Sequence, residues 1–148
     1  MSLEQTISEA IKTAMREKDR VALDSLRAVK AQILLLQTEA RGAEVTTEQE
    51  IAILQRMIKQ RKDSYEQFTA QGRTDLAEVE EAQSKIIEKF LPKQLSAEEL
   101  ESEIKKIISE TGAESIKDLG KVMGVASKAL SGKSDGKSIS EMVKKLLS

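Results

Sequence analysis

The chain contains no cysteine and no histidine among its 148 residues. These absences exclude zinc sites built on thiolate or imidazole ligands, cysteine nucleophiles and serine–histidine triads. Without cysteine there is also no disulfide framework. The sequence therefore lacks most of the side chains on which familiar enzyme chemistry depends.

Long apolar runs are missing as well. There is no stretch of about 18 apolar residues, so we expect no membrane span and no membrane partner. The opening residues, MSLEQTISEAIKTAM, lack the basic start and apolar centre of a secretion signal. Together with the absence of cysteine, these features predict a cytoplasmic location.

Two sequence patterns resemble parts of a nucleotide-binding loop and of a serine–lysine catalytic pair, but neither has the residues that such a site requires. Gly-Lys-Ser, the end of a phosphate-binding P-loop, occurs twice within residues 132–138, but neither copy has the first glycine of that loop or a preceding strand. The Ser-x-x-Lys pairs Ser102–Lys105 and Ser134–Lys137 are expected by chance in a chain rich in both residues. We therefore predict no catalytic residue, no metal and no cofactor.

What the sequence does contain is helical periodicity. Apolar residues make up 39% and charged residues 33%, which is typical of a soluble helical protein. Apolar side chains recur at intervals of three and four residues, and capping boxes mark helix starts at Thr47, Ser96 and Ser138. Asp19 is placed to cap the second helix. The predicted helices cover about 3–17, 21–41, 47–71, 74–91, 96–112, 115–130 and 138–148.

Several details of this pattern are specific predictions. Gly132 is expected to cap the sixth helix, with a turn at 134–136 before Ser138. Tyr65 and Phe68 fall at core spacing in the third helix. The fourth helix is expected to bury Val79 in the same way.

The only proline, Pro92, marks the best domain boundary, because the residue before a proline is held out of helical geometry. We predict an all-α protein with an N-terminal four-helix bundle at 1–92 and a small three-helix domain at 93–148. Three short helices in about 55 residues make a marginal core. We therefore expect the second domain to be stabilised by contacts with the first domain or with a partner.

Charge is unevenly distributed although the formal net charge is only -1. Residues 117–148 carry seven lysines against three acids, a formal +4, and a second basic cluster lies in the third predicted helix. Such runs are either solvated faces or phosphate contacts, and the sequence leaves both open. The candidate nucleic-acid-binding residues are Gly120, Lys121, Gly124, Lys128, Lys133, Gly136 and Lys137, and the second cluster is Arg56, Lys59, Arg61 and Lys62.

Five short motifs carry a family resemblance. They are MIKQRKDS at 57–64, GRTDLA at 72–77, FLP at 90–92, DLGKVM at 118–123 and DGK at 135–137. In this order they resemble the GatB/YqeY family over essentially the whole chain. The sequence departs from the family in having Phe90 where tyrosine is common. It also has Lys133 where an arginine tends to follow the glycine.

The resemblance implies an all-helical protein related to the tail of the B subunit of glutamine-dependent aspartyl/glutamyl-tRNA amidotransferase. In that carbon–nitrogen ligase the tail helps to hold the tRNA body, while the chemistry belongs to other domains and subunits. Three interpretations follow. The first is a non-catalytic module that binds tRNA or associates with the amidotransferase or another translation protein. The second is a helical protein-interaction module without RNA, and the third is a free-standing amidotransferase or another enzyme.

Overall fold

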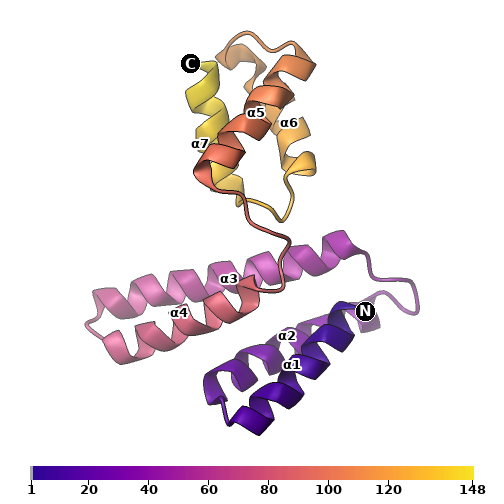
Figure 1. Cartoon of the computed structure of the whole chain (residues 1–148), viewed down its shortest axis with the longest axis vertical. Helices are drawn as coiled ribbons and strands as arrows, with labels where there is room; N and C mark the ends of the chain where they lie inside the picture. The colour runs from indigo at the N-terminus through magenta and orange to yellow at the C-terminus, as the bar shows by residue number, and fades with distance from the viewer. Residues whose placement is uncertain (1) are drawn as a thin grey trace. The chain divides into compact units, whose positions relative to one another are not determined.

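The computed structural model describes residues 2–148, and every regular element in that range is a helix (Figure 1). The prediction of an all-α protein is confirmed. The chain divides into two compact units, Met1–Leu91 and Pro92–Ser148. The elements are α1 (Leu3–Glu17), α2 (Arg20–Glu39), α3 (Thr47–Ala70), α4 (Thr74–Glu88), α5 (Ala97–Thr111), the 3-10 helix η1 (Ile116–Asp118), α6 (Leu119–Ala129) and α7 (Gly136–Leu147).

Short polar side chains fix where the helices begin. Asp19 caps α2 by accepting the Ala22 N–H at 3.0 Å, and Ser96 caps α5 in a capping box with Glu99, both as predicted. The predicted cap of α3 is wrong by one residue. Thr46, not Thr47, accepts from the third helical residue, because either of two adjacent threonines can supply the oxygen that a helix start needs.

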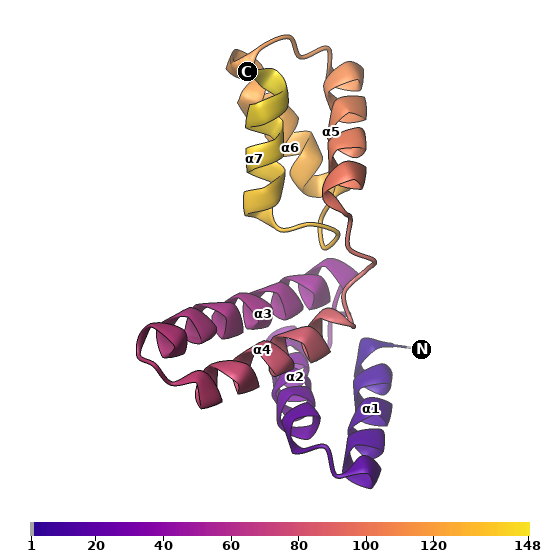
Figure 2. The same cartoon turned by 60° about the vertical axis from the view of Figure 1, so that its left-hand side comes forward.

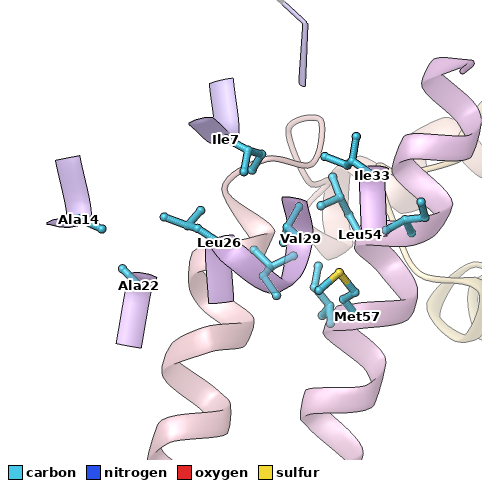
Figure 3. Close-up of a cluster of buried hydrophobic side chains, with 11 residues drawn as sticks. Ile7, Ala14, Ala22, Leu26, Val29, Ile33, Leu54 and Met57 are labelled. Carbon is cyan, nitrogen blue, oxygen red and sulfur yellow. The ribbon is translucent and has the colours of Figure 1, made fainter. Parts of the chain in front are cut away.

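The first unit consists of two helical hairpins. α1 lies beside α2, α3 lies beside α4, and the first hairpin crosses the second (Figures 1 and 2). α2 contacts both α3 and α4. Its buried side chains Val29 and Ile33 meet Leu54 and Met57 of α3 (Figure 3). α2 is therefore the helix that joins the two hairpins into one core.

The C-terminal half of α3 is more open than the sequence predicts. All of the buried residues of α3 lie between Ile53 and Ile58. Farther along, Tyr65 is 37% exposed, and Val79 of α4 is 40% exposed, so the prediction of core positions for these two is wrong. α3 is longer than its neighbours and is covered there mainly by α4, so core-like spacing does not lead to burial.

The second unit has a core of its own. Ile104 of α5, Val122 of α6 and Val143 of α7 are each fully buried. They belong to one apolar cluster made only of residues from 95–147. Each of the three helices therefore buries one face against the other two.

Candidate nucleic-acid interface

The solvent face of α6 combines glycine and lysine without any acid. Val122 and Ala126 are fully buried and mark the opposite face. Four exposed residues lie on the outer side, because helical residues four and seven apart share a face. They are Gly120, Lys121, Gly124 and Lys128, and we call them the α6 face.

Among the described residues, the two glycines of the α6 face have no packing role. A Cβ atom built on Gly120 or Gly124 meets nothing within 4 Å. Neither residue has a positive φ that would require glycine. Glycine inside a helix costs about 0.5–1 kcal/mol relative to alanine. Their effect within this unit is to leave helical backbone open to solvent.

Lys121 is held at the end of α5. Its Nζ donates to the carbonyl of Thr111 at 2.8 Å, where the C-terminal end of a helix favours a cation. Asp118 stands nearby, but its carboxylate is directed to the backbone. The N–H groups of Glu114 and Ser115 donate to it at 2.9 and 3.4 Å and hold the pKa of Asp118 below its usual value. Lys121 therefore reaches from the edge of the α6 face to the end of α5.

The connection between α6 and α7 differs from the prediction. Gly132 is not the C-cap of α6, since that place belongs to Leu130; it lies beyond the helix with a φ of 77°. Ser138 does not cap α7. Asp135 does, by accepting the Ser138 N–H at 2.6 Å, because aspartate caps at least as well as serine. Gly136 therefore belongs to the helix and not to the turn.

This change alters the charge around the turn. The carboxylate of Asp135 now stands at the start of α7, between Lys133 and Lys137 in the sequence. These two lysines therefore have an acid within two residues in the sequence. Lys121 also has an acid nearby, because the backbone N–H bonds described above and, to a smaller extent, the charge of Lys121 lower the pKa of Asp118, whereas α6 itself contains no acid beside Lys128. Among the ion pairs of residues 2–148, none involves a lysine from 117–148.

The arginines of the second basic cluster bind neighbouring helices. Arg61 donates to the Gln83 side chain of α4 at 3.3 Å and to the Met57 carbonyl at 3.2 Å. Arg56 donates to Gln32 of α2 at 3.1 Å. Both arginines therefore link α3 to another helix of the first unit.

The lysines of this cluster are engaged as well. Lys59 pairs with Asp63 at 3.0 Å, and Lys62 pairs with Glu88 of α4 at 3.4 Å. Each lysine would have to give up a carboxylate before it could bind a phosphate. The two basic clusters of the sequence thus have different surroundings: Lys59 and Lys62 are paired with carboxylates, whereas the tail lysines make no ion pair within residues 2–148.

Among the described residues, no acidic side chains gather into a group that could hold a metal ion. In the same part of the chain, no helix has both the length and the apolar character that crossing a membrane requires. The arrangement around α6 offers positive charge and accessible backbone.

Comparison with known proteins supports the resemblance seen in the motifs. Residues 4–147 match the model of the Yqey-like protein family. A relative from Meyerozyma guilliermondii, "Altered inheritance of mitochondria protein 41, mitochondrial", is 36% identical over 58% of this chain, and the match spans 44% of that relative. A protein of the same name from Pyrenophora tritici-repentis is 29% identical over 93% of this chain and 76% of its own length.

The names of these relatives contradict the predicted cytoplasmic location. They describe mitochondrial proteins, as do those of two further yeast relatives. The prediction rested on the lack of cysteine and of a secretion signal, and neither feature identifies a compartment. The match across almost the whole chain, with the five motifs in order, carries one firm conclusion: the chain belongs to the Yqey-like protein family.

Proposed function

We propose that the protein is a non-catalytic helical module that binds the body of tRNA through the lysine-rich side of its second unit. The observation that carries this proposal is the α6 face, where two exposed lysines and two open glycines occur on a helix without an acid. Lysine contributes charge without base specificity, and glycine lets a phosphate backbone come close.

The chemistry of the face favours structured RNA over unpaired bases. Proteins that bind single strands stack the bases on aromatic side chains. Aromatic residues make up only 2% of this chain, and its three aromatic residues, Tyr65, Phe68 and Phe90, all lie in the first unit. We therefore expect the ligand to be structured RNA, whose phosphate backbone is recognised by its shape and charge.

The resemblance to the amidotransferase tail supplies the substrate class and a set of partners. By that likeness the module would work beside a glutamine-dependent carbon–nitrogen ligase or another translation protein, and would leave the amide chemistry to it. The names of the curated relatives contain no substrate. The proposal therefore depends on the α6 face and on the resemblance.

We also propose that the two units act as a four-helix domain and a three-helix domain, joined near Pro92. Limited proteolysis should then cut first between Leu91 and Ala97. Early cleavage within α2 would place the boundary elsewhere.

The test of RNA binding compares two pairs of lysines. Replacing Lys121 and Lys128 with glutamine removes the charges of the α6 face, and replacing Lys133 and Lys137 removes those around Asp135. Each lost phosphate contact should lower the slope of log K against log salt for tRNA by roughly one unit or less. We expect the larger loss from the first pair.

A matched control comes from the first unit. Lys12 and Lys30 make no ion pair among the described residues, and their replacement by glutamine changes the net charge equally. If the control variant weakens tRNA binding as much as the α6 variant, the attraction is diffuse and the proposed site is wrong. Circular dichroism must show that all variants stay folded.

One observation favours a second function, a protein-interaction module without RNA. Ile116 and Val125 are 47% and 42% exposed, and both lie close in sequence to the α6 face. Exposed apolar side chains beside lysine suit an acidic protein surface. If this function is correct, tRNA binding should be absent at moderate salt in the wild-type protein. Partners recovered with the protein should then be lost on replacing Val125 with serine.

A further inference from the structure

The segment that opens the second unit is fastened to the turn between α6 and α7. Gln94 uses its side-chain amide for this contact. Its Nε2 donates to the carbonyl of Gly132 at 2.6 Å and to the carbonyl of Pro92 at 2.8 Å. One side chain therefore shapes the linker and holds a residue 38 positions farther along the chain.

A backbone bond supports the same contact. The Leu95 N–H donates to the carbonyl of Lys133 at 2.9 Å. Gly132 is buried and has a φ of 77°, a conformation that other residues rarely adopt. Two successive carbonyls of the turn thus face the linker, and the turn has little freedom to change without breaking these bonds.

We propose that residues 92–95 form a clamp that sets the conformation of the lysine turn, residues 131–135, and thereby regulates phosphate binding at Lys133 and Lys137. This inference rests on the proposed function for its RNA part. The first unit ends at Leu91, immediately before the clamp. A force that moves Leu91 passes along the chain through Pro92 and Lys93 to Gln94.

The coupling works in both directions. If opening the clamp weakens RNA binding at the turn, RNA binding must close the clamp by the same factor. The clamp thus gives the first unit, or a partner bound to it, a route by which to change the affinity of the tail for RNA. No contact between the two units is required, because the chain itself carries the effect.

The clamp is tested first without RNA, in the full-length protein. Gln94→Glu keeps the size of the side chain but replaces the donor with a carboxylate that faces two carbonyls. Trypsin cleavage after Lys133 should become about five- to tenfold faster, as loss of one hydrogen bond predicts for local opening. Cleavage after Lys117 in the same digest should not change. Gln71→Glu, at an exposed glutamine without a side-chain bond among those described, should leave both rates unchanged.

The reverse experiment changes the turn and reads the linker. Gly132→Ala strains the turn and should speed cleavage after Lys93. Gly112→Ala is the matched control, because Gly112 has a similar positive φ of 69° but lies at the end of α5, away from the linker. If both variants speed cleavage after Lys93 equally, the effect is general destabilisation and the clamp does not exist.

RNA binding then tests the regulation. In the wild-type protein, tRNA should slow hydrogen exchange at the Leu95 amide. Gln94→Glu should lower the slope of log K against log salt for tRNA by no more than the Lys133→Gln/Lys137→Gln double substitution does. Combining Gln94→Glu with that double substitution should give no further decrease in the slope. Faster cleavage after Lys133 with unchanged tRNA binding would show that the clamp exists but does not regulate RNA binding. If the wild-type protein binds no tRNA, the proposed function and the regulation fail together, and the cleavage rates still decide whether the clamp is real.

Discussion

Replacing the glycines of the α6 face with alanine should raise stability and lower RNA affinity at once. Gly124 lies in the middle of α6, where glycine costs about 0.8–1 kcal/mol relative to alanine. Gly120 lies in the first turn, where we take a smaller value of about 0.5 kcal/mol. The added methyl groups meet nothing within 4 Å, so no clash offsets this gain.

The double variant Gly120→Ala/Gly124→Ala should therefore be more stable by about 1.5 kcal/mol. For a unit of about 60 residues this corresponds to a rise in Tm of about 6–12 °C. Gly112→Ala should have the opposite sign and cost about 1–2 kcal/mol, because the φ of 69° at Gly112 suits only glycine without strain. The same chemical change thus has opposite effects at the two sites.

The assay must report on the second unit. The chain has no tryptophan, and its single tyrosine, Tyr65, belongs to the first unit. Intrinsic fluorescence is therefore uninformative, and native-state hydrogen exchange at the buried residues Val122 and Ala126 is the direct measurement. Binding of tRNA to the same samples completes the test.

Two results would refute the reasoning. Loss of stability in the double variant would mean that the glycines are needed inside the unit. Higher stability with unchanged tRNA affinity would mean that no ligand approaches the α6 face. The expected result is a several-fold loss of affinity in a more stable protein.

Three further predictions concern the fold. Asp135→Ala should cost about 1 kcal/mol and Ser138→Ala almost nothing in chemical denaturation, because Asp135 caps α7. The depressed pKa of Asp118 adds stability that is fully present above the usual carboxyl pKa of about 4 and is lost as pH falls through the lower folded value. Asp118→Asn should consequently destabilise the protein at neutral pH and make little difference in strong acid. Ile104→Ala removes a fully buried side chain and should cost about 2–5 kcal/mol, measured by hydrogen exchange in α5.

The sequence predicted helix starts well where one residue alone could cap. Asp19 and Ser96 have no competing neighbour and were placed correctly. The errors arose where two good capping residues lie close together. Asp135 precedes Ser138 by one helical turn, and both are followed by a helical pattern, so periodicity could not choose between them.

Burial was predicted less well where a helix extends past its neighbours. The spacing of Tyr65 is typical of a core position, but burial depends on a second helix being present on that side. The hydrophobic pattern also gives no signal for Ser25, which is fully buried with its hydroxyl donating to the Ala22 carbonyl at 2.9 Å. A polar residue whose partner is its own helix backbone leaves no trace in a hydrophobic pattern.

The candidate site depended even more on long-range contacts. In the sequence the second basic cluster, in α3, and the tail lysines look alike, because both are basic runs on predicted helices. Their difference lies in partners such as Gln32, Gln83 and Glu88, which are more than 20 residues away from the cations that they bind. Only a folded chain reveals which cations are engaged.

That difference also decides where an anion should bind first. A phosphate that approaches Lys62 must replace the existing ion pair with Glu88. The loss of that ion pair offsets part of the favourable free energy of the new phosphate contact. A phosphate that approaches Lys128 breaks no ion pair among the described residues and meets no acid on α6. Since the electrostatic gain of each contact is modest and strongly dependent on salt, this difference favours the tail. Removing the competing carboxylate should therefore reveal the hidden cation: Glu88→Gln is expected to increase tRNA binding at low salt through Lys62, and no increase would mean that the α3 cluster is out of reach of the RNA.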